Sequence, residues 1–319
     1  MKSILKAMAA AAALVAPGLA MAQSFPDKPV RLIIPYSAGA SNDLLGRYLA
    51  DSLGKIWGQP VMVENIPGAG GALGIAAAAR SEPDGYNLLW ASSTFSPTAA
   101  ANPNLPFDFA TDLTPINKVG EGELLAITGT RVPIRTVDEL IQKSKEQTIF
   151  FAGTGPASIP SFMGTLMNGE LGIEMEGVNY KGGSEAILDL VAGRVDLYVG
   201  TITSTQAMIN EGTAFPLVML GKERSTVYPD VPTIVEAGYP GAAADIWWGV
   251  FGPAGMGEEL VTKIHDDIST VMAAPETLAM FETHGARPVT MPQPEFVELV
   301  THELARWKAL VEKYGITVD

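Results

Sequence analysis

The chain has 319 residues, of which 47% are hydrophobic, enough to build the cores of about two domains. It contains 21 Lys and Arg against 35 Asp and Glu, a formal net charge of −14. Such an acidic surface repels phosphate backbones and anionic lipids, so we expect no nucleic-acid partner. Because the chain has no cysteine, disulfides, thiolate metal sites and a cysteine nucleophile are excluded.

The N-terminus has the pattern of a secretory signal peptide. Lys2 and Lys6 give a basic start, residues 7–16 form a short apolar run, and Ala20-Met21-Ala22 gives a small-x-small cleavage pattern. The apolar run is shorter than the roughly 20 residues that cross a bilayer; an uncleaved anchor or a buried helix is the alternative. We therefore expect residues 1–22 to be removed and the mature protein to be exported to the periplasm.

Short apolar runs alternate with helical patterns from Pro29 onward. The apolar runs predict strands at residues 30–34, 61–64, 87–91, 124–128, 149–152, 176–179, 195–199, 215–220 and 247–251. Helical spacing predicts helices at residues 42–55, 71–80, 136–145, 158–168, 183–191, 204–210, 258–272, 275–283 and 294–314. The connections between the first strands are too long for hairpins, which favours a parallel sheet covered by helices and an α/β fold.

Two blocks that form sheets, followed by a helical C-terminal segment, predict two α/β lobes. We expect the chain to pass between them near residues 125–130 and 220–235, the second passage lying in the turn-rich stretch around Pro229 and Pro232. Lobe 1 then comprises residues 23–125 and 235–319, and lobe 2 comprises residues 126–234.

Small and hydroxyl-bearing residues follow four of the predicted strands. In the first turn, residues 35–43, Gly39 permits a close approach to the backbone, and Ser41 or Asn42 can cap the next helix. Free N–H groups at a helix start, aided by the helix dipole, bind a carboxylate or phosphate without a cationic side chain. Similar turns are residues 92–94, 153–158 and 180–184. Because ligands of open α/β sheets bind at the carboxyl ends of strands, the four turns predict a cleft site, although each alone also fits an ordinary strand-to-helix turn.

Catalytic and cofactor motifs are missing from the sequence. In residues 68–74, Leu73 occupies the place of the third glycine of a dinucleotide fingerprint. His265, His284 and His302 stand outside any H-E-x-x-H arrangement, and there is no G-x-S-x-G turn. We therefore expect no metal, no cofactor and no catalytic residue, and a binding protein rather than an enzyme.

Several short motifs follow one another in a fixed order over nearly the whole mature chain. They are residues 25–36 (FPDKPVRLIIPY), 58–65 (GQPVMVEN), 67–71 (PGAGG), 83–86 (PDGY), 180–183 (YKGG), 229–233 (PDVPT) and 236–238 (EAG). With these motifs the chain resembles the extracytoplasmic solute-binding proteins of tripartite tricarboxylate transporters, also called Bug proteins.

The resemblance implies a two-lobed fold of the type II periplasmic-binding-protein kind, a Venus flytrap, with a small organic acid held between the lobes by backbone N–H groups, hydroxyls and bridging waters. Together with the turns described above, it gives the expected ligand-binding residues: Tyr36, Ser37, Ala38, Gly39, Ala40, Ser41, Asn42, Asp43, Ser92, Ser93, Thr94, Thr154, Gly155, Ala157, Ser158, Tyr180, Gly182 and Gly183. Family members usually have three glycines where this chain has Gly39, Ala40 and Ser41, and often have His in place of Ser161. Ala40 and Ser41 therefore add side-chain bulk beside the expected carboxylate position.

The expected function is that of a monomeric periplasmic protein that captures a small carboxylate. The ligand is a dicarboxylate or an aromatic carboxylate, delivered to the membrane components of a tripartite tricarboxylate-type transporter. Two other functions stay open: a ligand-sensing partner of a membrane signalling receptor, and an exported enzyme that acts on organic acids.

Overall fold

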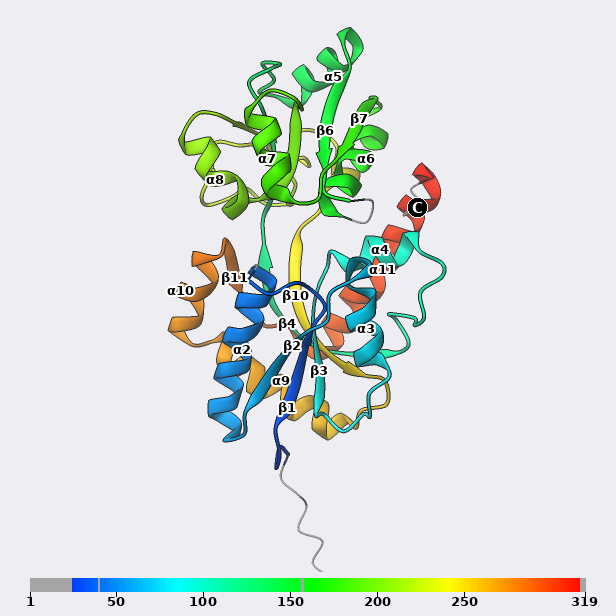
Figure 1. The fold of residues 1–319 in the computed structure, drawn as a ribbon, viewed down its shortest axis with the longest axis vertical. Helices are drawn as coiled ribbons and strands as arrows, with labels where there is room; N and C mark the ends of the chain where they lie inside the picture. The colour runs from blue at the N-terminus through cyan, green and yellow to red at the C-terminus, as the bar shows by residue number, and fades with distance from the viewer. Residues whose placement is uncertain (1–24, 40, 156–157, 316–319) are drawn as a thin grey trace, which may run out of the picture.

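The computed structural model describes residues 25–39, 41–155 and 158–315, so the expected signal peptide at residues 1–22 lies outside the described residues. The chain forms two α/β lobes, which lie one above the other in Figure 1. Both lobes are built from a central sheet with helices on its faces, as the alternation of apolar runs and helical patterns predicts.

Lobe 1, the lower one in Figure 1, contains a six-stranded sheet ordered β11-β4-β10-β3-β1-β2. Its strands are β1 (Val30–Ile34), β2 (Val61–Asn65), β3 (Asn87–Ser92), β4 (Leu113–Gly122), β10 (Ile246–Pro253) and β11 (Ala286–Pro288). Its helices are α2 (Ser41–Trp57), α3 (Ala72–Ala79), α4 (Phe95–Ala101), α9 (Glu258–Met272), α10 (Pro275–Thr283) and α11 (Gln293–Tyr314), with the short 3₁₀ turn η1 (Ala69–Gly71).

Lobe 2 contains a five-stranded sheet ordered β7-β6-β8-β5-β9. Its strands are β5 (Leu124–Thr128), β6 (Ile149–Gly153), β7 (Met175–Asn179), β8 (Leu197–Thr201) and β9 (Phe215–Met219). Its helices are α5 (Val137–Glu146), α6 (Ile159–Leu171), α7 (Gly183–Val191) and α8 (Ile202–Asn210), and the 3₁₀ turn η2 (Pro240–Ala242) follows later in the chain.

Each sheet is parallel in one part and antiparallel in another. Strand β1 is parallel to β2 and β3, and β6 is parallel to β7 and β8, as the long connections predict. Strand β10 is antiparallel to β3 and β4, and β5 is antiparallel to β8 and β9. Two of these antiparallel pairs, β4 with β10 and β5 with β9, have the same cause. The chain leaves lobe 1 along β4 and enters lobe 2 along β5, and it returns along β9 and β10 in the opposite direction.

The passages between the lobes differ in length. Only Glu123 separates the end of β4 from the start of β5. The return runs from the end of β9 to the start of β10, over residues 220–245. Past its middle, Ile234 still donates its N–H to Met219 O of β9 at 2.7 Å, so most of the return stays beside lobe 2. Near its end, Ala244 donates its N–H to Leu220 O, at the start of the return, at 2.8 Å. The expected boundary at 125/126 thus falls inside β5, and the one at 234/235 falls within the return.

Three elements of lobe 1 do not follow from the apolar patterns of the sequence: β4, α4 and β11. The interior of β4 contains Pro115, Asn117 and Lys118, which hide the alternation typical of a strand. The amide nitrogen of this buried Asn117 nevertheless has partners in α9, because Nδ2 donates to His265 O at 3.1 Å and lies 2.9 Å from Ser269 Oγ. Long-range contacts therefore stabilise a strand that local sequence does not predict.

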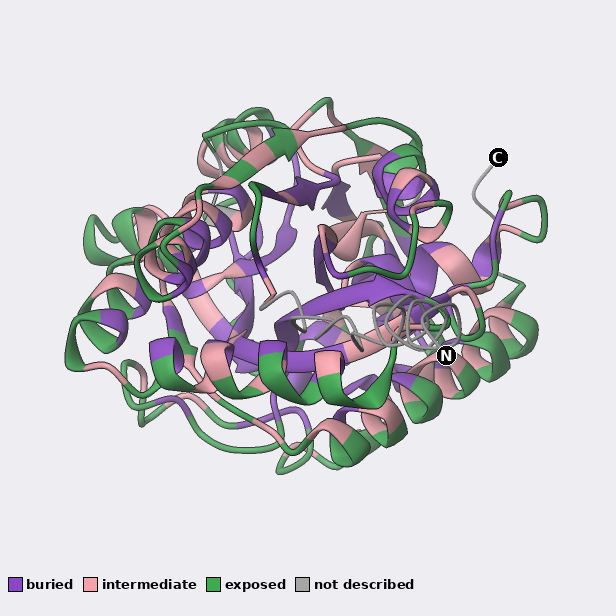
Figure 2. Ribbon diagram, turned by 90° about the horizontal axis from the view of Figure 1, so that it is seen from below, coloured by how far each residue is buried: buried purple, intermediate pink, exposed green. Residues whose placement is uncertain are grey.

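The core of lobe 1 lies between its sheet and the inward faces of its helices. Leu32, Ile34 and Trp90 of the sheet are completely buried, as are Leu45 and Leu49 of α2. Each such side chain contributes roughly 1.5–3 kcal/mol of hydrophobic free energy. In Figure 2 the strands are mostly purple, whereas the outer faces of the helices are green, so the sheets form the buried centre of the molecule and the helices cover them.

Candidate functional site

The four expected turns lie where strands of the two lobes end. In lobe 1, β1 ends at Ile34 and β3 at Ser92; in lobe 2, β6 ends at Gly153 and β7 at Asn179. The start of α2, at the top of lobe 1, and the start of α6, at the bottom of lobe 2, lie on the facing sides of the two lobes in Figure 1. The turns before α2 and α6 are thus on the sides that a ligand held between the lobes would touch.

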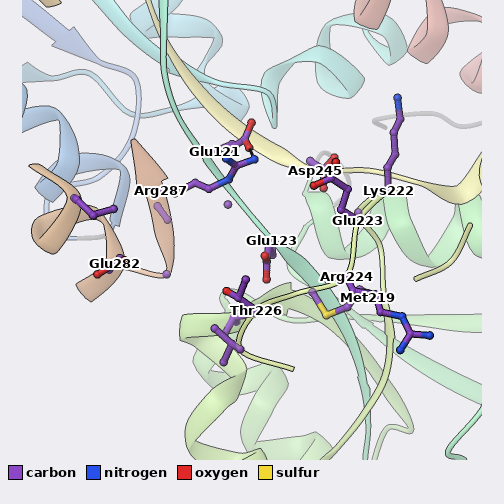
Figure 3. Close-up of a pocket in the computed structure, with 17 residues that line it drawn as sticks. Glu121, Glu123, Met219, Lys222, Glu223, Arg224, Thr226, Asp245, Glu282 and Arg287 are labelled. Carbon is purple, nitrogen blue, oxygen red and sulfur yellow. Dashed lines mark ion pairs between the residues drawn. The ribbon is translucent and has the colours of Figure 1, made fainter. Parts of the chain in front are cut away.

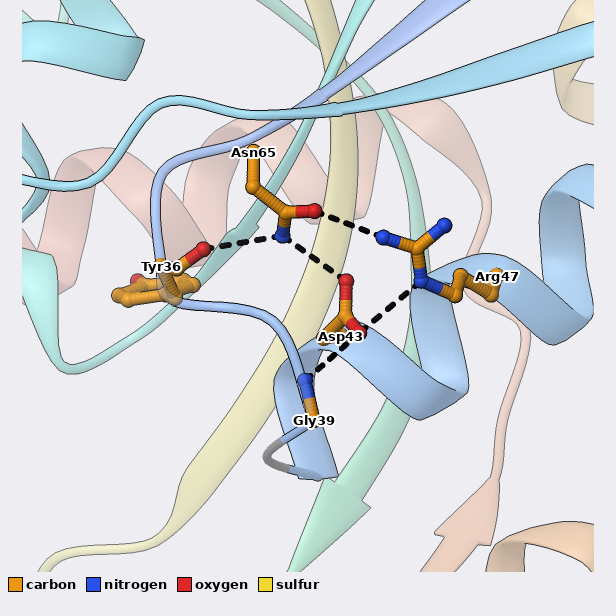
Figure 4. Close-up of polar contacts among 5 residues, drawn as sticks. All are labelled: Tyr36, Gly39, Asp43, Arg47 and Asn65. Atoms are coloured by element: carbon orange, nitrogen blue, oxygen red, sulfur yellow. Dashed lines mark hydrogen bonds and ion pairs between the residues drawn. The ribbon is translucent and has the colours of Figure 1, made fainter.

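The turn after β1 is braced from inside by the buried carboxylate of Asp43, as Figure 4 shows. Asp43 Oδ2 accepts the Gly39 N–H at 2.8 Å and the Arg47 Nε–H at 2.9 Å, and its Oδ1 accepts from Asn65 Nδ2 at 2.8 Å. The Asn65 amide also donates to Tyr36 O at 3.0 Å and accepts from an Arg47 guanidinium nitrogen at 2.7 Å. Asn65 and Arg47 were not among the expected site residues, yet they hold the turn in shape.

The ionisation of Asp43 follows from these contacts. Burial alone would raise the pKa of Asp43, but the hydrogen bonds from Arg47, Gly39 and Asn65 outweigh burial and lower the pKa below the ordinary 3.8. Asp43 is therefore a carboxylate at neutral pH. Because it accepts the Gly39 N–H, this N–H is already hydrogen-bonded within the protein. Gly39 itself has a φ of +88°, a conformation that favours glycine.

The remaining residues of this turn divide into exposed and bonded ones. Ser37, Ala38 and Gly39 are exposed. Asn42 Oδ1 accepts the Trp248 Nε1–H at 2.5 Å, which joins the start of α2 to strand β10. Ser41 is the first residue of α2; Ala40, like Ala157 in lobe 2, lies outside the described residues.

Three hydroxyl groups form a cluster beside this turn. Tyr36 OH lies 2.8 Å from Ser92 Oγ and 3.3 Å from Thr94 Oγ1, and the two smaller hydroxyls lie 2.7 Å apart. The Ser92 N–H also donates to Tyr36 OH at 3.3 Å. Hydroxyls can both donate and accept, so this cluster can turn its O–H groups toward an anion.

Ser93 differs from its neighbours because its hydrogen bonds go to the return strand β10. It donates its N–H to Trp247 O at 2.9 Å, its Oγ accepts the Trp247 N–H at 3.1 Å, and the same Oγ donates to Asp245 O at 3.3 Å. Ser93 is only 4% exposed. The hydroxyl hydrogen of this expected ligand residue is therefore already used within the protein.

The turn after β6 in lobe 2 is closed by serine hydroxyls. Ser158 caps α6: its Oγ accepts the Thr154 N–H at 3.1 Å and the Ser161 N–H at 3.4 Å, and lies 2.8 Å from Gly155 O. Ser161 Oγ donates to the same Gly155 O at 2.7 Å. Gly155 has a φ of +108°, so this turn depends on glycine for its shape.

The start of α7, like that of α4, has no side-chain cap. Its N-cap residue is Gly182, which has no side chain to accept the first N–H groups of the helix. A Cβ on Gly182 would meet nothing within 4 Å, whereas a Cβ on Gly183 would lie 2.9 Å from the hydroxyl of the buried Tyr198. The first turn of α7 therefore presents backbone N–H groups next to open space, an arrangement suited to an anion.

Tyr180 precedes this helix start and is held by a carboxylate. Its hydroxyl donates to Asp189 Oδ2 at 2.9 Å. Burial, and then the Asp189 carboxylate, raise the pKa of Tyr180 to about 12. Tyr180 thus stays a neutral phenol that orients the turn, and Asp189 is paired in addition with Arg194.

A separate cavity of about 790 Å³ lies at the hinge between the lobes (Figure 3). Its lining includes Glu121 of β4, Glu123 of the first passage, Asp245 of the return, Glu282 of α10 and Arg287 of β11, but none of the expected ligand-binding residues. The Glu121 carboxylate forms ion pairs with Lys118, whose Nζ lies 2.5 Å from Oε2, and with Arg287. These residues come from distant parts of the chain, and no spacing in the sequence connects them.

Metal-binding chemistry has no candidate in the part of the chain that the structure describes, where no group of three or more His, Asp or Glu could hold an ion. Over residues 25–39, 41–155 and 158–315, no helix combines the length and the apolar character needed to cross a membrane.

Comparison with known proteins identifies the family. The family model described as the tripartite tricarboxylate transporter family receptor matches residues 45–316. Protein BugT of Bordetella pertussis is 31% identical over 299 residues, which cover 92% of this chain and 91% of that protein.

Two solved structures from Rhodopseudomonas palustris are also similar. MatC, solved with bound malate, is 29% identical with a TM-score of 0.76, over 90% of this chain and 100% of that chain. A second R. palustris protein, solved with adipate, is 25% identical with a TM-score of 0.78, over 92% of this chain and 99% of that chain. By the match to the family model and the identity to BugT, the chain belongs to the receptor family of tripartite tricarboxylate transporters, whose members are two-lobed solute-binding proteins and not enzymes.

Proposed function

We propose that the protein captures a small dicarboxylate between its two lobes in the periplasm, after loss of residues 1–22, and delivers it to the membrane components of a tripartite tricarboxylate-type transporter. The bound malate and adipate of the two R. palustris relatives support a dicarboxylate over an aromatic carboxylate. Each of these ligands has two carboxylates, so one can be held by each lobe.

The observation that carries this proposal is the pairing of two neutral donor groups on facing lobes. In lobe 1, Tyr36, Ser92 and Thr94 form the hydroxyl cluster. In lobe 2, the start of α7 at Gly182 has no side-chain cap. Hydrogen bonds to a charged group contribute about 1.5–3 kcal/mol each, so two or three on each carboxylate are enough for tight capture without a cationic side chain.

The cation nearest to the first turn does not compete for this role. Arg47 is engaged by Asp43 at 2.9 Å and by Asn65 at 2.7 Å. Its charge is therefore largely neutralised by Asp43, and the carboxylate is held by dipoles. An acidic protein can bind an anion in this way because oriented N–H and O–H groups set the local field at the site.

The test is a thermal-shift and calorimetry screen of malate, succinate, adipate, citrate, benzoate and, as a cation control, putrescine. A ligand at a hundredfold excess over its dissociation constant adds about 2.7 kcal/mol to the free energy of unfolding. At about 2–4 °C per kcal/mol, this raises the melting temperature by roughly 5–10 °C. We expect this for at least one dicarboxylate, with one site per chain. Binding of benzoate alone contradicts the dicarboxylate, and binding of putrescine alone contradicts the carboxylate.

A substitution at Tyr36 tests whether the hydroxyl cluster binds the ligand. Tyr36→Phe removes one O–H and keeps the ring, so we expect the affinity for the dicarboxylate to fall about 10- to 150-fold, as the loss of one hydrogen bond to a charged group implies. Tyr48→Phe, which removes a hydroxyl bonded to Thr277 Oγ1 at 2.9 Å inside lobe 1, is the control and should bind as the parent does. Unchanged affinity in Tyr36→Phe contradicts the assignment of the cluster.

A further inference from the structure

Helix α11 makes contacts in both lobes. Its first half is packed on the sheet of lobe 1, where Phe296 is completely buried. The Phe296 ring lies 5.4 Å from that of Trp247 and 5.3 Å from that of Phe251, both in β10. Gln293 Nε2 also donates to Pro115 O of β4 at 3.0 Å. This half of α11 therefore moves with lobe 1.

The second half of α11 is packed on α6 of lobe 2. The ring of Trp307, 3% exposed, lies 6.0 Å from that of Phe162 in an edge-to-face arrangement. At the end of the helix, Tyr314 OH donates to Glu170 Oε1 at 2.5 Å, and Lys313 Nζ lies 3.1 Å from the same oxygen. In Figure 1, α11 rises out of lobe 1 beside α4, toward the level of lobe 2.

The approach of α11 to lobe 2 is close enough to depend on glycine. A Cβ on Gly169 of α6 would lie 2.1 Å from the ring of Tyr314. In addition, the Arg306 guanidinium donates to Gly241 O at 3.2 Å and to Ala243 O, so α11 also holds the return passage. These contacts involve apolar packing, a charged pair and backbone carbonyls, which together make the bridge more than a single surface ion pair.

We propose that α11 is a third connection between the lobes, a strap that limits how far the cleft opens. The two covalent passages fix the hinge, whereas the strap joins the lobes at α6. Helix α6 has 13 residues, about 20 Å at the rise of an α-helix. The strap holds its Glu170 end, and Ser158 of the ligand turn caps its other end. When the contacts of the strap restrict the movement of α6, they therefore also restrict the movement of the ligand turn at the other end of this helix.

This inference rests on the proposed function only in that opening and closing serve ligand capture, and its test needs no ligand. The chain has no cysteine, so Met62→Cys on β2 and Leu188→Cys on α7, at side chains 60% and 67% exposed, give one spin-label pair across the lobes. Protein unfolded and refolded to remove any bound solute is measured by double electron–electron resonance.

The variant is Lys313→Ala with Tyr314→Ala, which removes the end of the strap and leaves Trp307 and the core in place. We expect its distance distribution to shift to longer values and to broaden relative to the parent. Lys308→Ala, at an exposed position of the same helix, and Tyr48→Phe are controls that should keep the parental distribution. Circular dichroism checks that every variant is folded.

An unchanged distribution in the folded double variant overturns the strap, and so does an equal shift in the controls. The proposed function fails separately, in the carboxylate screen, and neither result depends on the other.

Discussion

Ser93 and Trp247 exchange two hydrogen bonds: Ser93 donates its N–H to Trp247 O at 2.9 Å, and Trp247 donates its N–H to Ser93 Oγ at 3.1 Å. The pair joins the turn after β3, which carries the hydroxyl cluster, to the strand along which the chain returns to lobe 1. A change in the direction of that strand therefore acts directly on Ser92 and Thr94.

Ser93→Ala should lower the free energy of unfolding by about 1–3 kcal/mol, since the buried Trp247 N–H loses its acceptor. Urea unfolding measures the effect. Ser37→Ala, at an exposed position of the turn after β1, should be neutral within about 0.5 kcal/mol. Equal stability of parent and Ser93→Ala would mean that another group takes over the Trp247 N–H.

Asp43→Asn should destabilise the protein by about 1.5–3 kcal/mol, because the charged acceptor for Arg47 and Gly39 is lost. The pKa of Asp43 is lowered in the folded protein, so its contribution is complete above the ordinary value of 3.8 and is lost as the pH falls through the lowered value. Urea unfolding between pH 5 and pH 3 should therefore show a steeper loss in the parent than in Asp43→Asn.

The control for this pH series is Asp51→Asn, at an exposed position of the same helix, which should follow the parent. Parallel curves for the parent and Asp43→Asn would show that the Asp43 carboxylate adds nothing to the stability of the turn.

Glu303 of α11 gives the opposite pH dependence. Its Oε2 accepts the Trp247 Nε1–H at 3.0 Å. Burial, with a smaller contribution from the Asp245 carboxylate, nevertheless outweighs the opposing effects of Trp247, Arg306 and Lys118 and raises the pKa of Glu303 to about 7. A raised pKa means that stability is lost as the pH rises from the ordinary 4.5 toward 7. Between pH 5 and pH 8 the loss is at most about 3 kcal/mol.

Glu303→Gln keeps an acceptor for Trp247 and removes the titration, so its free energy of unfolding should change less than that of the parent over this range. Glu298→Gln, at an exposed position of α11, should keep the parental slope. If Glu303→Gln retains the full slope, the pH dependence belongs to another group.

The two glycines at the start of α7 should respond differently to alanine. Gly183→Ala places a Cβ 2.9 Å from the Tyr198 hydroxyl, so α7 or Tyr198 has to shift and the melting temperature should fall. Gly182 has a φ of −172° and open space around its Cβ position, so Gly182→Ala should fold normally and weaken dicarboxylate binding by crowding the ligand. A stable Gly182→Ala with parental affinity would move the ligand away from this helix start.

The sequence predicts those parts of the fold that depend on local patterns. Strand β1 is apolar except for Arg31, and the turn of small residues after it can be predicted directly from the sequence. The brace of that turn is not visible, because Asp43 and Asn65 are 22 residues apart and become neighbours only when β1 and β2 pair. Likewise, β4 is stabilised by contacts of Asn117 with α9 that no local pattern contains.

Helix α11 is a second example of a contact that the sequence alone does not predict. Its periodicity predicts the helix and its apolar face, but Phe296 and Trp307 are simply two members of that face. Only the folded chain reveals that Phe296 is packed in lobe 1 and Trp307 on Phe162 of lobe 2. Periodicity predicts that a residue is buried; it contains no information on which partner buries it.

The single residue between β4 and β5 has a consequence for engineering. Because Glu123 alone joins the two strands, residues 113–128 form one nearly continuous extended segment that runs from lobe 1 into lobe 2. An insertion in this segment would uncouple the two lobes. The return over residues 220–245 is long and rich in turns, so it has slack for an inserted reporter domain. A fluorescent biosensor for the bound solute is therefore best built into the exposed part of this return, near Glu223. There, a change in the relative position of the two lobes would be converted into an optical signal.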